Sequence, residues 1–256
     1  MTCGMDSGLY AAYTGLLART QALDTAANNL ANAGTNGFRA QRDYFSGVLA
    51  GGLDQDPETA SQVGQSVNGF GVLGGNRLDL GQGELQATGN PLDLALEGQG
   101  FFALQTANGI RYTRDGAFSR SSTGVLQTSQ GEPVLDANQK SITIPTGAVR
   151  VSPDGSISVS NADGSVIVGK VGSFDFADKS ALIAEGANRF SANDAKPIAA
   201  NASVEEGSLE GANEDSVHGT MQLVLVQRQA EMMQKALSVF NNDFDKTASE
   251  DLPRVT

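Results

Sequence analysis

The sequence predicts a mainly β fold with terminal α-helices, in which a central antiparallel β domain, barrel-like or sandwich-like, lies between two helical ends. Three observations predict it. Apolar residues recur every seven positions at both ends, short alternating stretches separated by turn residues fill the middle, and the 256 residues include 31 glycines but no tryptophan. Because a seven-residue repeat places apolar side chains on one face, we expect the terminal helices to form a coiled-coil-like core segment.

The first segment, residues 1–46, contains the N-terminal helix, which we expect over residues 7–33. Ser7 is suited to cap its start and Gly34 its end. Asparagines at the end of the apolar face allow two interpretations: turn formation, or a polar interlock with a neighbouring helix. We predict an assembly interface on this face, made of Leu9, Tyr13, Leu16, Leu23, Ala27, Asn29, Leu30 and Asn32.

The last segment, residues 204–256, contains the C-terminal helix, which we expect over residues 216–247, preceded by acidic residues that suit the positive end of a helix dipole. Two apolar rows with a spacing of seven run along it. We expect this helix to pair with the N-terminal one and to extend the assembly interface through Leu225, Met232, Met233, Leu237, Val239 and Phe240.

Between the helices, we expect residues 47–90 to form a linker or an extended excursion, because 11 of these 44 residues are glycine. A G-x-G-x-x-G string covers residues 69–74. A dinucleotide-binding loop requires a helix directly after it, and the residues that follow do not resemble a helix start, so we do not interpret the string as a nucleotide site.

Residues 91–203 should form the central β domain. Alternating or apolar stretches at 92–96, 101–104, 110–113, 141–144, 149–151, 157–159 and 166–168 are typical of short strands. Tight turns are indicated at Asn108-Gly109, Asp115-Gly116, Asp154-Gly155 and Asp163-Gly164.

Composition argues against several classes of function. A formal charge of −12 disfavours nucleic acid and anionic membrane surfaces as partners. No apolar run approaches the roughly 18 residues of a membrane-spanning helix, and no cleaved signal peptide is visible, whether the chain starts at Met1 or Met5. With Cys3 and His218 as the only cysteine and histidine, we expect no internal disulfide, metal site or cofactor, and no enzyme.

Three segments resemble the bacterial flagellar axial proteins, the rod and hook family. Residues 28–39, NNLANAGTNGFR, resemble the N-terminal rod signature of that family. Residues 88–102, TGNPLDLALEGQGFF, continue through RYTRDGAF at 111–118 to PVL at 133–135 and form the most specific match. Residues 209–213, LEGAN, followed by a long helix, resemble the C-terminal segment of the family.

This resemblance implies a structural subunit of the basal-body rod in the bacterial flagellum. Its helices would form the inner core of a helical tube around the export channel, with the β domains outside. Its partners would be copies of itself, other rod and hook proteins and the export apparatus, which exports it without a cleaved signal. Residues 227–235 resemble the proximal rod subunit, and residues 81–90 resemble the distal one. The alternatives are a secreted β-rich hydrolase and a ligand-binding β module.

Overall fold

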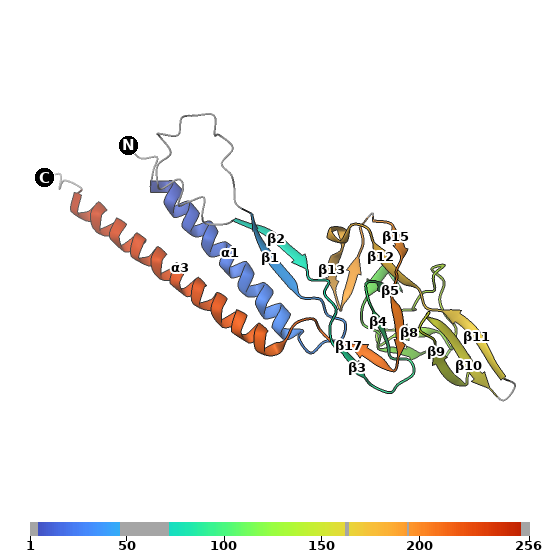
Figure 1. The fold of residues 1–256 in the computed structure, drawn as a ribbon. Helices are drawn as coiled ribbons and strands as arrows, with labels where there is room; N and C mark the ends of the chain where they lie inside the picture. Colours follow the sequence, from blue (N-terminus) through green and yellow to red (C-terminus); the bar gives the residue numbers. More distant parts are fainter. Residues whose placement is uncertain (1–4, 47–71, 162–163, 194, 252–256) are drawn as a thin grey trace. The chain divides into compact units, whose positions relative to one another are not determined.

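The computed structural model describes residues 5–46, 72–161, 164–193 and 195–251, and for residues 5–12, 45–46, 72–74 and 240–251 it describes the backbone alone. The chain divides into two compact units (Figure 1). The helical unit comprises residues 1–30, 41–77 and 217–256, and the β unit comprises residues 31–40 and 78–216. The segment boundaries expected at residues 46, 90 and 203 stay a prediction.

The described helical unit contains the two long helices and one strand pair: α1 (Met5–Ala31), β1 (Gln41–Ser46), β2 (Val72–Leu78) and α3 (Ser216–Asp251). Both predicted helices are confirmed within a few residues. Gly34 does not adopt the left-handed conformation expected of a capping glycine. Gly37, three residues later, does adopt it, with φ of 68°. No described helix has a stretch long and apolar enough to span a membrane.

The β unit is built from short strands and one 3₁₀ turn. These are β3 (Leu85–Ala87), β4 (Leu94–Glu97), β5 (Phe101–Thr106), β6 (Gly109–Thr113), β7 (Phe118–Arg120), β8 (Leu126–Thr128), β9 (Ala148–Val151), β10 (Ser156–Asn161), β11 (Gly164–Lys170), β12 (Ser173–Phe176), η1 (Lys179–Ala181), β13 (Ile183–Gly186), β14 (Arg189–Ser191), β15 (Pro197–Ala199), β16 (Ser203–Glu206) and β17 (Ser208–Glu210).

The largest sheet of the β unit has the order β13-β14-β6-β5-β12-β15, and a second has the order β11-β10-β9. The remaining strands form the pairs β16–β4, β17–β3 and β7–β8. These pairings are antiparallel, as predicted. The described strands do not close into a barrel, because β13 and β15 remain the two edges of the largest sheet; the barrel-like alternative is therefore wrong.

Strand β5 is buried on both faces because its side chains alternate between two cores. Phe102 and Leu104 pack in a core with β4, β8 and β10, whereas Phe101 and Ala103 pack in a core with β6, β12 and β14. The second core contains edge-to-face aromatic pairs, such as Tyr112 against Phe176 with ring centroids 4.8 Å apart. The β unit therefore closes around its own apolar residues.

The turn glycines were predicted correctly in part. Gly109 and Gly155 have φ values of 97° and 87° and join β5 to β6 and β9 to β10. Gly116 has another role: a Cβ there would lie 1.6 Å from the carbonyl oxygen of Leu94, so glycine permits a close backbone approach. Of the expected glycine-rich segment, residues 47–71 lie outside the described residues, and the end of the G-x-G-x-x-G string lies in strand β2.

Candidate assembly interface

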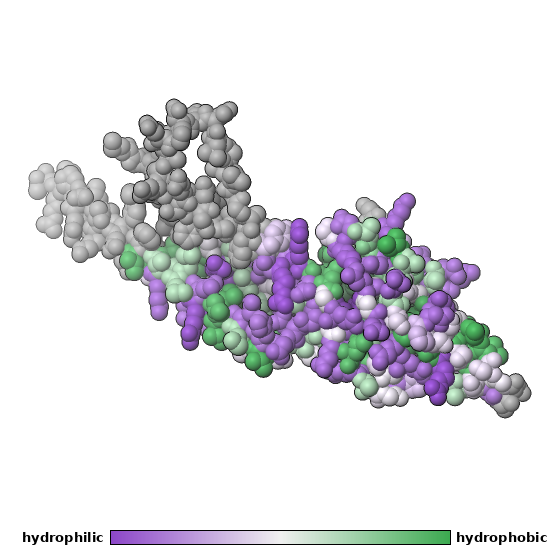
Figure 2. Space-filling model, viewed as in Figure 1, coloured by the Kyte–Doolittle hydropathy of each residue, from purple (hydrophilic) through white to green (hydrophobic). Residues whose placement is uncertain are grey.

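Helix α3 carries two apolar faces, only one of which is buried within the chain. Ala230 and Leu237 are buried, and Leu223, Val226 and Met233 on the same side are half-buried. The other face leaves large apolar side chains exposed: Leu225 (57% exposed), Met232 (63%) and Val239 (57%), together with Val217, Met221 and Val224. Green patches interrupt the hydrophilic surface over α3 in Figure 2. We call this exposed face the outer stripe.

Helix α1 turns alanines, and not its leucines, inward. Ala18, Ala22 and Ala26 are buried at a spacing of four residues. The predicted seam residues Leu16, Leu23 and Leu30 are half-buried, while Tyr13 and Ala27 are exposed; the side chain of Leu9 is not described. Leu17, which the sequence reasoning did not select, is 59% exposed. Since small residues shorten the distance at which helix backbones can approach, α1 uses its narrowest face internally.

Helices α1 and α3 lie side by side in the helical unit and run in opposite directions (Figure 1). Ala22 and Ala26 of α1 share the lining of a cavity of about 330 Å³ with Leu225 and Val226 of α3. Gln41, Arg42 and Asp43 of β1 also line this cavity, so it lies where both helices and β1 approach one another.

The side chain of Asn29 forms its hydrogen bonds within the chain. It is only 5% exposed, and its amide nitrogen donates to the carbonyl oxygen of Gln41 at 2.8 Å while its amide oxygen accepts from the Gln41 backbone N–H at 2.9 Å. This reciprocal pair ties the end of α1 to the start of β1. Asn32 forms a turn instead, its carbonyl oxygen accepting from the backbone N–H of Thr35 at 2.9 Å.

The predicted residues therefore fall into three groups. Asn29 and Leu237 are buried in the single chain, and Tyr13, Ala27, Leu225, Met232 and Val239 remain open to solvent. The half-buried group contains Leu16, Leu23, Leu30, Asn32 and Met233. The side chain of Phe240 is not described. A helical repeat identifies the apolar residues, but it does not determine which of two adjacent rows faces inward.

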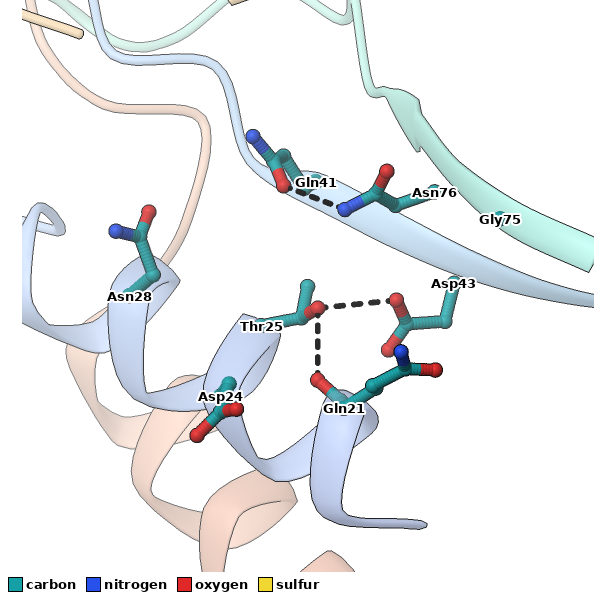
Figure 3. Close-up of a pocket in the computed structure, with 8 residues that line it drawn as sticks. All are labelled: Gln21, Asp24, Thr25, Asn28, Gln41, Asp43, Gly75 and Asn76. Carbon is teal, nitrogen blue, oxygen red and sulfur yellow. Dashed lines mark hydrogen bonds between the residues drawn. The ribbon is translucent and has the colours of Figure 1, made fainter. Parts of the chain in front are cut away.

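A polar pocket lies between α1 and the β1–β2 pair, with a volume of about 520 Å³ (Figure 3). Four amide side chains and two carboxylates line it: Gln21, Asn28, Gln41, Asn76, Asp24 and Asp43. Thr25 Oγ1 donates to Asp43 Oδ1 at 3.0 Å. Burial raises the pKa of the Asp43 carboxyl, and this hydrogen bond partly opposes the shift. No basic side chain lines this pocket among the residues that are described.

A buried ion cluster in the β unit joins residues far apart in the sequence. Glu210, on β17, is fully buried and contacts two arginines through its two oxygens: Arg39 Nη2 lies 2.6 Å from Oε1, and Arg114 Nη1 lies 3.0 Å from Oε2. Arg114 also donates to the carbonyl oxygen of Gly98 at 2.6 Å. Burial lowers the pKa of Arg114, Glu210 opposes that shift and Arg39 adds to it.

The same region fixes the two chain segments that continue into the helices. The Gly37 N–H donates to the carbonyl oxygen of Glu210 at 2.7 Å, and the Asn213 side chain accepts from the Ala40 N–H at 2.8 Å. Asn213 also donates to the carbonyl oxygen of Asp79 at 2.7 Å. Residues 37–40, after α1, and residues 210–213, before α3, are thus held together inside the β unit. We call this arrangement the junction.

Sequence reasoning assigned no role to Arg39 and Arg114, and it counted Glu210 among the acidic residues that suit the start of the C-terminal helix. The structure instead places Glu210 on β17, buried between the two arginines. Their mutual contact, across as many as 171 positions, becomes visible only in the fold. The described residues offer no group of three histidine, cysteine or acidic side chains placed to hold a metal ion.

Comparison with known proteins identifies the family. Residues 95–168 match the family described as the flagellar hook protein FlgE/F/G D1 domain, and residues 9–39 match flagella basal body rod protein. The flagellar basal-body rod protein FlgF of Caulobacter vibrioides is 34% identical over 91% of this chain and 93% of its own length. FlgF of Escherichia coli is 33% identical over 90% and 93%.

The flagellar basal-body rod protein FlgG of Bacillus subtilis is 31% identical over 86% of this chain and 89% of its own length. The similarity thus extends over both helical ends and the β unit, and it gives no support to the hydrolase alternative. The chain belongs to the flagellar basal-body rod protein family, whose members are structural subunits and not enzymes.

Proposed function

We propose that this rod subunit polymerises through its terminal helices, with copies of itself and with other rod and hook proteins, into a helical tube. The outer stripe of α3 carries this proposal. A helix that belonged only to a closed monomer would expose few large apolar residues on the face away from its partner. Here six such residues share that face, from Val217 to Val239, with Leu225 at its edge, where it also lines the cavity beside α1.

The free energy of assembly would come largely from covering this stripe. Complete burial of a leucine, valine or methionine side chain contributes roughly 1.5–3 kcal/mol, before the cost of ordering the chain. Because a subunit in such a tube has neighbours on several sides, both faces of α3 could be covered and the helices could form the coiled-coil-like core predicted from the sequence. Head-to-tail contacts of this kind propagate as an open helix.

The junction supports a mechanical role for the β unit. A rod that transmits torque needs the β region and the helical core to turn together. Since residues 37–40 and 210–213 are fixed to one another around the buried Glu210, the β unit holds both chain segments that continue into the helices. We infer that the junction limits how far the two helices can move independently under load.

The position in the cell follows from family membership at the level of the flagellar basal body. We further propose that the protein leaves through the flagellar export apparatus without a cleaved signal and lies in the part of the rod that spans the periplasm, enclosing the export channel. Among rod subunits, the proximal one is the first alternative and the distal one the second; the relatives carry both the FlgF and FlgG names.

The test is Met232→Asp, compared with Ser238→Asp on the same helix. Both positions are exposed, so neither change should unfold the chain. We expect Met232→Asp to abolish incorporation into isolated basal bodies, and with it swimming, in a strain lacking its own copy of the gene. Ser238→Asp should retain both. Circular dichroism of the purified variants checks the fold. Normal incorporation of Met232→Asp would contradict the proposal.

A further inference from the structure

The exposed face of α1 changes character along its length. Tyr13 and Leu17 form an apolar start, followed at helical spacing by Gln21, Asp24 and Asn28, which line the polar pocket. Asp24 and Asp43 bring two carboxylates to this pocket, and among the described residues neither forms an ion pair. Carboxylate and amide oxygens together match the N–H groups of a guanidinium.

The outer stripe of α3 contains a basic residue among its apolar ones. Arg228 lies between Leu225 and Met232, is exposed and forms no ion pair within the described part of the chain. Lys235 occupies a similar place nearer the C-terminus. Arg228 therefore offers the charge that the pocket lacks, on the surface that the proposed assembly would cover.

Symmetry determines how these surfaces would meet. Subunits related by rotation about a tube axis and translation along it keep the direction of each helix relative to that axis. Because α1 and α3 are antiparallel within one chain (Figure 1), α1 of one copy meets α3 of the next antiparallel as well. In that arrangement, moving toward the N-terminus on α1 corresponds to moving toward the C-terminus on α3.

We propose that Arg228 of a second copy enters the pocket that Asp24 and Asp43 line, and that this charged contact sets the register between neighbouring subunits. Tyr13 lies 11 residues before Asp24, and Val239 lies 11 residues after Arg228. At 1.5 Å per residue both separations are about 16 Å, so the same register brings Tyr13 against Val239. Leu17 falls between Met232 and Val239.

Burial of Asp43 adds to this complementarity. A carboxyl whose pKa is raised by desolvation is ionised at a cost, and a cation that reaches the pocket relieves that cost. The occupant is thus an arginine side chain on an apolar helix of the same protein. This inference rests on the proposed function, since it names the contact by which the terminal helices of neighbouring copies pack.

The experiment uses charge reversal in the full-length chain. In a strain lacking the gene, we expect Asp24→Lys and Arg228→Asp each to lower incorporation into basal bodies by about tenfold or more, because like charges then face each other. The double variant should recover incorporation. Lys140→Asp, in the β unit, changes the net charge by the same amount as Arg228→Asp and should incorporate normally.

Co-expression of the two single variants decides whether the contact joins different copies. Alternating subunits would pair the lysine introduced in one variant with the aspartate introduced in the other and keep the native pair at the next contact, so incorporation should recover. Recovery in the double variant but not on co-expression would place the pair within one chain and overturn the inference. Normal incorporation of either single variant, or no recovery in either arrangement, would overturn it too.

Failure of this inference is distinguishable from failure of the proposed function. If Met232→Asp blocks incorporation while charge reversal has no effect, the helices assemble with another register and the proposed function stands. If Met232→Asp incorporates normally, the outer stripe is not an assembly surface and both proposals fail.

Discussion

The two units treat their apolar residues in opposite ways. Nine of the thirteen large apolar side chains that are exposed among the described residues lie in the helical unit, although it holds fewer of those residues; the β unit exposes Val166, Ile167, Ile183 and Ile198. The β unit buries aromatic and aliphatic side chains on both sides of β5, and it buries the charges of the junction as well.

Geometry explains the difference. A strand has two faces that sheets of the same chain can cover from both sides, as they do for β5. A long helix presents its whole circumference, and one antiparallel partner covers only one stripe of it. The β unit can therefore be complete in a single molecule, while a pair of helices with two apolar faces cannot. The comparison separates the part that is complete within one chain from the part that we propose assembles.

In the β unit, we expect the largest loss of stability from Glu210→Ala. It removes the only carboxylate of the buried cluster and leaves Arg39 and Arg114 facing each other, which should cost about 3–5 kcal/mol of unfolding free energy. Urea denaturation monitored by circular dichroism measures it. Glu185→Ala breaks an exposed pair with Arg111 and should change stability far less. Equal effects would show that burial of the cluster is unimportant.

Alanine substitutions on the two faces of α3 distinguish residues that stabilise the monomer from residues that we propose act in assembly. Leu237→Ala removes a buried side chain and should cost about 2–3 kcal/mol, toward the low end for such changes because the helix pair has few neighbours. Met232→Ala should leave the stability of the monomer within about 0.5 kcal/mol. Thermal unfolding of purified monomer measures both. A destabilised Met232→Ala monomer would mean that the outer stripe is already covered in the single chain.

Two glycines three positions apart test the junction. Gly37→Ala forces a side chain into a left-handed conformation, at about 1–2 kcal/mol, and its Cβ would lie 2.3 Å from the Asp115 backbone nitrogen, which adds to that cost. A Cβ at Gly34 meets nothing within 4 Å and its φ is not positive, so Gly34→Ala is the matched control and should be neutral. Chemical denaturation compares them, and equal stabilities would contradict the geometry.

The smallest expected effect concerns pH. Burial, and then the neighbouring Asp93, raise the pKa of Asp115 above its ordinary value of 3.8, while the Ala117 N–H partly opposes the shift. As pH rises, the Asp115 carboxyl of the unfolded chain loses its proton at a lower pH than that of the folded chain. The free energy of unfolding therefore falls as pH rises from 3.8 through the raised pKa. Asp115→Asn should flatten that decline in denaturation midpoints measured across this range.

An exposed aspartate supplies the opposite sign as a control. Hydrogen bonds from Ser156 lower the pKa of Asp154, so its stabilising contribution is lost as pH falls through its lowered pKa. Asp154→Asn should reduce stability above that pH and should not reproduce the effect at Asp115. A decline that persists unchanged in Asp115→Asn would assign the pH dependence to other groups.

Much of the fold could be predicted from local patterns. Both long helices, the hairpin turns at Gly109 and Gly155 and most strands of the β unit follow from periodicity and turn residues. The errors share a cause. The left-handed glycine after α1 is Gly37 and not Gly34, and only the surrounding structure distinguishes the two positions. An antiparallel series of short strands is equally consistent with a barrel and with open sheets. Such choices depend on contacts between distant residues, which a local pattern does not contain.

The sequence by itself determined that this chain has two helical ends with a seven-residue apolar repeat around a β region, and that it resembles flagellar axial proteins. Only the tertiary structure decided that α1 faces inward through alanines, that Leu225, Met232 and Val239 face outward, and that Arg39, Arg114 and Glu210 share one buried site. The physical reason is that hydrophobicity and charge belong to residues, whereas burial is a property of their neighbours, which the chain brings together only when it folds.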